Sequence, residues 1–204
     1  CNTILTSPDG TTWTERYSGI TSTHLNSVVY SNNHFIVVGW SDTILTSLDG
    51  VTWTESSTEI KTRLESVTYG NNQFVTVGCY GTILTSPYGA TWTERSTGIK
   101  KRLSSVTYGN NQFIAVGDID TILTSPDGVT WTKISSVTDN DLESVTYANN
   151  QFIAVGDRGT ILSSKADDVT TDIITLNPDI KATWPLSITK VSNRLFIQMP
   201  NTSH

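Results

Sequence analysis

The sequence predicts an all-β protein assembled from one repeated unit, and three observations lead to this prediction. Tryptophans recur at nearly equal intervals, at Trp13, Trp53, Trp92 and Trp131. A glycine series and a serine series recur at equal intervals, from Gly39 to Gly156 and from Ser27 to Ser144. No apolar stripe of helical period recurs between these markers. A fixed period of roughly 40 residues is typical of a solenoid or a propeller.

One repeat unit contains four short strands. From Leu103 it reads LSSVTYGNNQFIAVGDIDTILTSPDGVTWTKI. The segments SVTY, QFIAVG, TILTS and VTWTKI are rich in β-branched and aromatic residues, and the turn signals GNN, DID and PDG separate them. Four strands joined by tight turns form one antiparallel sheet. Four strands in about 40 residues predict a blade of a β-propeller.

The number of repeats predicts five blades in a single domain. Complete blades are expected at residues 24–57, 63–96, 102–135 and 141–175, whereas residues 1–18 contain only the last two strands of a blade. The C-terminal segment LSITKVSNRLFIQMP aligns with LSSVTYGNNQFIAVG, the first two strands. We therefore expect residues 185–204 and 1–18 to share one blade, which closes the ring and removes an open strand edge. The alternative is a fragment of a larger ring.

The repeated peptide SPDGVTW is a turn with a structural explanation. Its aspartate is suited to accept backbone N–H groups, its glycine to adopt a positive φ, and its tryptophan to pack between blades. Here the sequence resembles the Asp-box repeats of the bacterial neuraminidase type and the photosystem II stability and assembly factor-like propellers, over nearly the whole chain. The usual Asp-box has one more residue between Asp and Gly. The third copy has Tyr88 in place of Asp, and the fourth, SSKADDVTT, has lost Gly and Trp.

In the families that the sequence resembles, the Asp-box is a structural turn on the rim, away from the usual binding face. The resemblance therefore implies a structural role for Asp9, Gly10, Trp13, Asp49, Gly50, Trp53, Gly89, Trp92, Asp127, Gly128 and Trp131. A carboxylate repeated around a ring is also poorly suited to one asymmetric active site.

The candidate ligand-binding residues lie in the loops of the opposite face, where the repeats differ from one another. By analogy with other propellers, ligands collect on this face near the central channel. The loops between second and third strands contribute Trp40, Asp42, Tyr80, Asp118, Asp120, Asp157 and Arg158. The links between blades contribute His24, Arg63 and Arg102. The alternative for each residue is drift in a solvent-exposed loop, and Trp40 and Tyr80 are suited either to stack on a sugar or to pack on neighbouring loops.

These residues predict a non-catalytic binding module, lectin-like or protein-binding, that uses the variable-loop face. The alternative, implied by the resemblance to photosystem factors, is an assembly or scaffold factor for a protein complex. A glycosidase is the third hypothesis, with Asp118, Asp120 and Asp157 as its carboxylates. Two of these occupy one repeat position, and the three arginines Arg63, Arg102 and Arg158 do not match a sialidase triad. We therefore expect no enzyme.

Composition excludes several other classes. The net charge of −6 and the pI of 4.9 disfavour nucleic-acid binding, and no apolar run reaches the ~20 residues of a membrane span. We expect no cofactor and no metal, because the three histidines are scattered and the DID loop offers too few oxygens for Ca²⁺. A disulfide between Cys1 and Cys79 is not expected, and Cys1 is either a lipidated residue or the boundary of an excised piece. We expect a monomeric, secreted or extracytoplasmic protein.

Overall fold

The computed structural model describes residues 3–20, 23–56, 58 and 60–165, together with three short strands near the C-terminus, and it confirms an antiparallel all-β protein. Among these residues the strands form four four-stranded sheets and two two-stranded sheets. Sheet 1 contains β3 (Leu25–Ser31), β4 (His34–Gly39), β5 (Ile44–Ser47) and β6 (Thr54–Ser56). Sheet 2 contains β7 (Leu64–Gly70), β8 (Gln73–Gly78), β9 (Ile83–Ser86) and β10 (Thr93–Arg95).

The remaining sheets repeat the same order. Sheet 3 contains β11 (Leu103–Gly109), β12 (Gln112–Gly117), β13 (Thr121–Ser125) and β14 (Thr132–Ile134). Sheet 4 contains β15 (Leu142–Ala148), β16 (Gln151–Gly156), β17 (Ile161–Lys165) and β18 (Ile173–Thr175). The two-stranded sheets are β1 (Ile4–Thr6) with β2 (Thr14–Arg16), and β19 (Ser187–Val191) with β20 (Arg194–Gln198). In the described residues no helix is long and apolar enough to cross a membrane.

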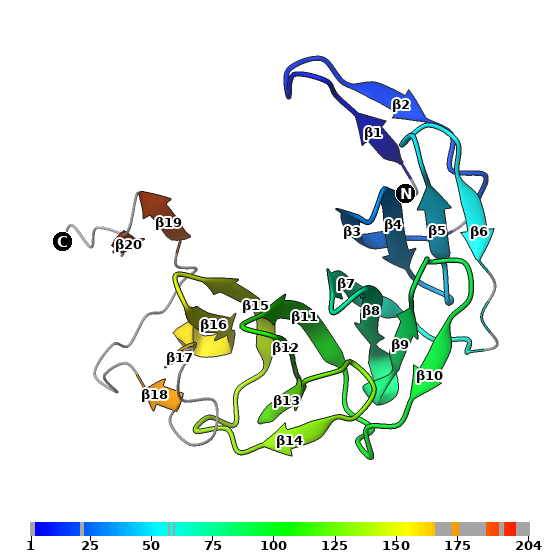
Figure 1. The fold of residues 1–204 in the computed structure, drawn as a ribbon. Coiled ribbons are helices and arrows are strands. Elements are labelled where there is room, and N and C mark those ends of the chain that lie inside the picture. Colours follow the sequence, from blue (N-terminus) through cyan, green and yellow to red (C-terminus); the bar gives the residue numbers. More distant parts are fainter. Residues whose placement is uncertain are drawn as a thin grey trace.

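The sheets stand side by side in an arc, with their first strands towards the centre and their fourth strands outside (Figure 1). The structure does not confirm the expected closing blade. The β1–β2 pair and the β19–β20 pair are separate sheets at the two ends of the arc. Each pair is a local hairpin, so β1 bonds β2 along one edge and has no strand along its other edge among the described residues. The closed ring is therefore not confirmed.

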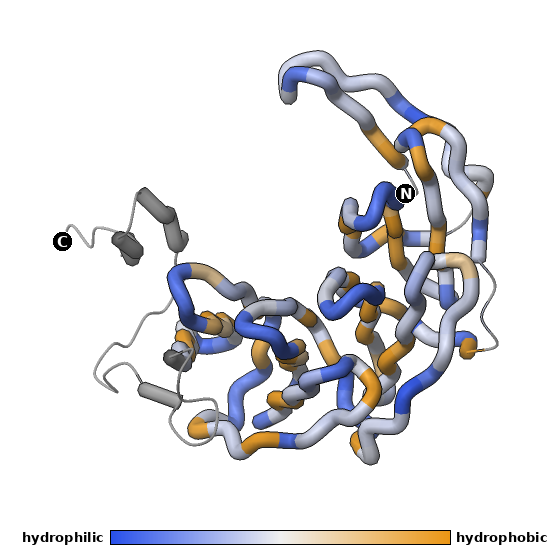
Figure 2. Tube along the Cα trace, viewed as in Figure 1, coloured by the Kyte–Doolittle hydropathy of each residue, from blue (hydrophilic) through white to orange (hydrophobic). Residues whose placement is uncertain are grey.

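The core lies between neighbouring sheets, and hydrophobic residues recur along the strands that border it (Figure 2). The second and third strands of one sheet pack on the first and second strands of the next sheet, and this contact repeats three times among the described residues. In sheet 2, for example, Val75, Val77 and Ile83 face Leu103, Val106, Phe113, Leu123 and Trp131 of sheet 3. Burial between neighbouring sheets explains why the second strands, such as β12, read as nearly continuous apolar runs.

The repeated serines connect neighbouring sheets by hydrogen bonds. The Ser27 hydroxyl oxygen accepts the backbone N–H of Val67 at 3.3 Å. Ser66 accepts from Val106 at 3.3 Å and Ser105 accepts from Val145 at 3.2 Å. This contact gives the regular serine period a physical cause: each innermost strand supplies one acceptor to the next.

The SPDGVTW turns are held by their own side chains. The Asp49 Oδ1 atom accepts the N–H groups of Thr52 at 2.7 Å and Val51 at 2.8 Å, and Gly50 donates to the Ser47 hydroxyl at 2.9 Å. The bond from Thr52, followed by that from Val51, lowers the pKa of Asp49 to about 2. The Trp53 indole N–H donates to the Gly50 carbonyl at 3.2 Å. The carboxylate is thus used to order the turn.

Candidate functional site

The loop between the second and third strands of each sheet lies against the link that precedes the first strand. The backbone N–H of Trp40 donates to the His24 carbonyl at 2.9 Å, and that of Cys79 donates to the Arg63 carbonyl at 2.9 Å. The same bonds join Asp118 to Arg102 and Asp157 to Asp141. These loops and links together form one surface, which we call the loop face.

The repeated glycine before each loop makes this close approach possible. A Cβ at Gly78 would lie 2.2 Å from the Arg63 carbonyl oxygen, and one at Gly117 would lie 2.0 Å from that of Arg102. No side chain fits such a distance. The glycine series therefore fixes the position of the candidate ligand-binding loops relative to the links.

The loop geometry pushes some side chains into solvent. Tyr80 adopts φ 59° and Ile119 adopts φ 40°, both in the left-handed region that is uncommon for side chains other than those of Gly, Asn and Asp. Their side chains are 76% and 51% exposed. Large apolar groups held outward at a conformational cost mark a candidate contact surface.

Trp40 forms the centre of a small cluster at the sheet 1 end of the loop face. Its ring lies 4.4 Å from the His24 ring, and the Arg63 guanidinium carbon lies 4.9 Å from the Trp40 ring centroid. Arg63 also binds Glu65, with 2.9 Å between Nε and Oε1. The structure therefore brings three predicted residues together in one cation–π cluster.

Arg102 joins three sheets through carboxylates. Its Nε lies 2.9 Å from Asp118 Oδ1 in sheet 3, and its Nη2 lies 2.7 Å from Glu143 Oε1 in sheet 4. Its Nη1 lies 3.9 Å from Glu65 Oε1 in sheet 2. Burial acts against the charged guanidinium, but the hydrogen bonds to Glu143 and Asp118 outweigh it and raise the pKa of Arg102. We call the chain from Trp40 through Arg63, Glu65 and Arg102 to Glu143 the loop-face network.

Sequence reasoning missed Glu65, Glu143 and Asn26. All three follow the first residue of an innermost strand and are therefore repeat-equivalent. Asn26 donates to the Leu64 carbonyl at 2.7 Å and to Glu65 Oε2 at 3.4 Å. The available signal was a polar residue directly after the first leucine of the strand, which reads Asn, Glu, Ser and Glu in successive repeats. The partners of this position come from neighbouring repeats, as Asn26 bonds Glu65 and Glu143 bonds Arg102.

Other predicted residues lie outside the loop-face network. Asp120 binds Lys133 and Lys101 at 3.0 and 3.3 Å, and these bonds, with Lys133 first, lower its pKa. Asp42 contacts Thr58, and burial raises its pKa. Within the described residues, no hydrogen bond or ion pair connects the side chains of Asp157 and Arg158 to the network. These two lie in the short turn of sheet 4, Asp157–Gly159.

The charge pairing limits the chemistry of the site. Asp118, Glu143 and Glu65 are each held in an ion pair with an arginine, so these carboxylates already have partners within the protein. In the part of the chain that the structure describes, no three His, Cys, Asp or Glu side chains are grouped to hold a metal ion. Cys79 is a free thiol near Glu65, and burial raises its pKa. Cys1 lies outside the described residues.

No protein-family model and no curated protein matches this chain. Several solved structures are similar to it. A structure of YCF48 bound to D1 peptide aligns with a TM-score of 0.69 at 16% identity, over 96% of this chain and 68% of that one. YCF48 from Cyanidioschyzon merolae aligns with a TM-score of 0.61 at 18% identity, over 89% of this chain and 68% of that one. The WD40 β-propeller domain of Doa1 aligns with a TM-score of 0.65 at 14% identity, over 84% of this chain and 60% of that one. The Asp-box interpretation stays a prediction from the turn sequences. At these identities the likeness concerns the fold, which is that of a β-propeller.

Proposed function

We propose that this protein is a non-catalytic binding propeller whose loop face holds a peptide segment of a protein partner. One observation carries the proposal: the loop face has a network that runs across four neighbouring sheets, and its loops also expose the side chains of Trp40, Tyr80 and Ile119. An extended segment meets such a surface over several sheets at once. Aromatic and arginine side chains are also the groups that dominate protein interfaces.

The distribution of aromatic residues favours a peptide over a repeated sugar site. A lectin with equivalent pockets between blades needs the same aromatic position in each repeat. Trp40 is the first residue of its loop, whereas Tyr80 is the second residue of the next loop. The loop face is therefore one asymmetric surface. The likeness to YCF48 bound to D1 peptide supports the same class of ligand. An assembly factor is one biological role for such a surface.

The experiment selects ligands from a displayed random peptide library, with a glycan array run in parallel on the same protein. Recovered peptides are titrated by fluorescence anisotropy against wild type, Trp40→Ala and Tyr80→Ala. A contact at the centre of an interface costs about 2 kcal/mol or more, roughly 30-fold in affinity. We expect a loss of that order in at least one loop-face variant.

Tyr88→Ala is the matched control. Tyr88 is also a highly exposed tyrosine, at 66%, but it belongs to a turn between the third and fourth strands, away from the loop face. We expect unchanged peptide affinity in this variant. Equal losses in Tyr80→Ala and Tyr88→Ala, or saturable binding to a glycan without any peptide, would overturn the proposal.

A further inference from the structure

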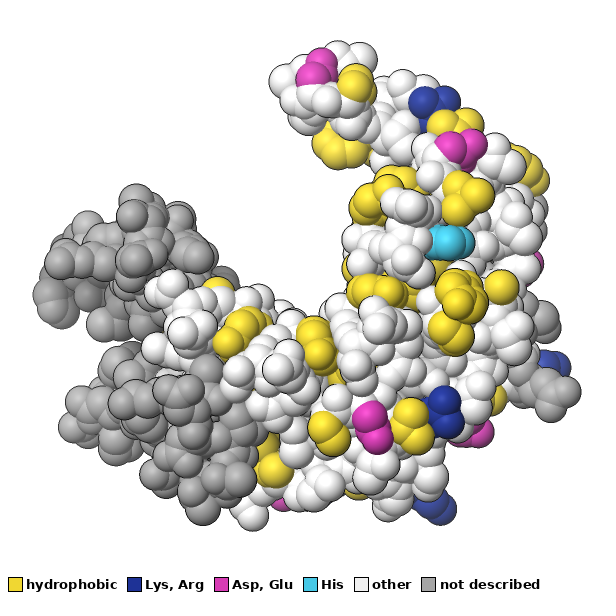
Figure 3. Space-filling model, in the orientation of Figure 1, with side chains coloured by type: hydrophobic (Ala, Val, Ile, Leu, Met, Phe, Trp, Pro, Cys, Tyr) yellow, Lys and Arg dark blue, Asp and Glu magenta, His cyan; other side chains and the backbone are white. Residues whose placement is uncertain are grey.

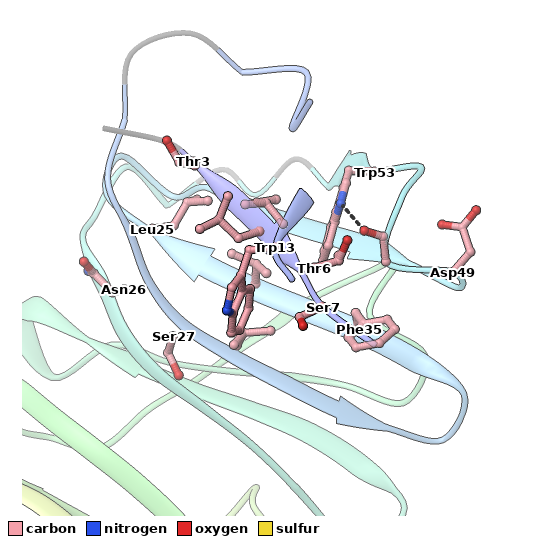
Figure 4. Close-up of a pocket in the computed structure, with 15 residues that line it drawn as sticks. Thr3, Thr6, Ser7, Trp13, Leu25, Asn26, Ser27, Phe35, Asp49 and Trp53 are labelled. Atoms are coloured by element: carbon pink, nitrogen blue, oxygen red, sulfur yellow. Dashed lines mark hydrogen bonds between the residues drawn. The ribbon is translucent and has the colours of Figure 1, made fainter. Parts of the chain in front are cut away.

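The end of the arc next to β1 contains an apolar cavity of about 660 Å³ (Figure 4). Its lining includes Ile4 and Trp13 from the β1–β2 sheet and Leu25, Val28, Phe35 and Trp53 from sheet 1. Hydrophobic side chains also show at the surface between these two sheets (Figure 3). The cavity lies where the neighbouring pairs among sheets 1 to 4 have a packed core.

Comparison with sheets 1 and 2 identifies what is missing from the cavity. There, Leu64, Val67 and Phe74 of sheet 2 are covered by Ile36 and Val38 of β4. Leu25, Val28 and Phe35 are the equivalent residues of sheet 1, one repeat earlier. The cavity therefore marks the place of a second strand in the sheet that contains β1 and β2.

The exposed fractions of single residues also indicate that a strand is missing beside β1. Val28 is 63% exposed, whereas its equivalents Val67, Val106 and Val145 are 5–7% exposed. Leu5 of β1 is 50% exposed, whereas its equivalent Leu123 is fully buried. Val28 lacks a covering sheet among the described residues, and Leu5 lacks a neighbouring strand there. One hairpin paired with β1 would cover both.

We propose that the hairpin β19–β20 of the same chain occupies this cavity, pairs with β1 and closes a ring of five blades. Its register identifies it. Ile188 pairs with Ile197 and Thr189 pairs with Phe196. In sheet 3, the aligned pairs are Val106 with Ala115 and Thr107 with Ile114. All pairs of the hairpin match the first hairpin of a blade in this way. The hairpin thus has the pairing of the two strands that the β1–β2 sheet lacks.

The connection is long enough for this placement. In sheets 1 to 3 the third strand ends with a serine, and the innermost strand of the next sheet contains the repeated serine. The number of residues between these two serines is constant from sheet to sheet, as from Ser125 to Ser144. The corresponding interval from Ser164 to Ser187 is slightly longer. A covalently attached hairpin is also present at high effective concentration, which favours it over a second copy of the chain.

The repeated serine bond predicts one specific contact of the closed ring. In three sheets this serine accepts the N–H of a valine in the next innermost strand. Alignment places Ser187 at the serine position and Val28 at the valine position. The Ser187 hydroxyl then accepts the N–H of Val28.

Disulfide trapping tests the proposal. The pairing of β12 with β13 joins Ala115 to Leu123, and the aligned pair is Ile197 with Leu5. In a Cys1→Ser, Cys79→Ser background, Leu5→Cys with Ile197→Cys places two thiols on one face of adjacent strands, within disulfide range. We expect an intrachain disulfide in the monomer, independent of protein concentration, seen by non-reducing electrophoresis and mass spectrometry.

The matched control is Leu5→Cys with Phe196→Cys, because successive side chains of a strand point to opposite faces. We expect this disulfide to form at least about tenfold more slowly. Equal rates for the two pairs, disulfides between two chains only, or no disulfide would each overturn the proposal. Hydrogen exchange of the chain without substitutions is the second measurement. We expect β1 amides to be protected like those of β13, and exchange at the rate of the outer strand β2 would contradict closure.

Discussion

Replacing Arg102 by alanine removes the residue that joins sheets 2, 3 and 4 on the loop face. Two close bonds are lost, to Asp118 at 2.9 Å and to Glu143 at 2.7 Å. The carboxylates are about a third and a half exposed, and each such pair is worth about 0.5–1 kcal/mol. Glu65 is nearly buried, but it keeps Arg63 at 2.9 Å and is not left uncompensated.

Together, the lost interactions of Arg102 predict a moderate loss of stability in Arg102→Ala. The two pairs, together with the packed stem of Arg102, amount to about 2 kcal/mol of the free energy of unfolding. For a chain of this size that corresponds to about 4–8 °C in Tm. Arg102→Lys should recover less than half, since one ammonium does not reproduce the geometry of two guanidinium bonds.

Urea unfolding followed by tryptophan fluorescence measures this difference at low salt and in about 1 M NaCl. We expect the effect of Arg102→Ala to shrink to about half in high salt, because partly exposed charges are screened. The matched control is Lys133→Ala, which removes an exposed lysine from Asp120 and should leave the unfolding midpoint unchanged. A change below about 0.5 kcal/mol in Arg102→Ala would refute the reasoning that the network stabilises the arrangement of the sheets.

Three further predictions concern turns and the closing end. The pKa of Asp49 is lowered to about 2 in the folded chain, against about 3.9 in the unfolded chain. The charged carboxylate therefore stabilises the fold fully above about pH 4, and this stabilisation is lost as the pH falls towards 2. Acid unfolding of Asp49→Asn should lack this step. Gly10→Ala and Gly128→Ala both place alanine at φ above 70°, but only at Gly128 would Cβ crowd the buried side chains of Val75 and Phe113, at 3.2 and 3.3 Å. Thermal unfolding should therefore show about 1 kcal/mol lost at Gly10 and about 2–3 kcal/mol at Gly128. Val106→Ala should lower the free energy of unfolding, measured in urea, by about 2 kcal/mol. Val28→Ala should lower it by the same amount when the ring is closed, because Val28 is then buried like Val106. An unchanged free energy of unfolding in Val28→Ala contradicts closure.

The repeat made most of the local structure predictable. Strand positions followed from the β-branched runs, and the turns followed from GNN and PDG, because both depend on neighbouring residues alone. The asparagines of the GNN turns indeed adopt positive φ, as Asn71 and Asn72 do. The loop face was also predictable, since alternating strand direction sorts the loops onto two sides.

The composition of the site was only partly predictable. His24, Trp40, Arg63, Arg102 and Asp118 come together as a group, while Asp157 and Arg158 in the loop of sheet 4 do not join it. Glu65 and Glu143 were missed because each lies within a strand, whereas the candidate residues were sought in the loops and links. Arg102, their shared partner, comes from a neighbouring repeat in both cases, so no local pattern links it to either glutamate.

By itself, the sequence determined the repeat, the four strands of each unit and the turns that separate them, because propensity and turn chemistry act over a few residues. Only the tertiary structure decided which charges meet. Arg102 contacts carboxylates from three sheets, and that depends on how neighbouring sheets pack around the centre of the arc. The tertiary structure also exposed the cavity beside β1, since an unfilled core becomes visible only when the sheets that border it are in place.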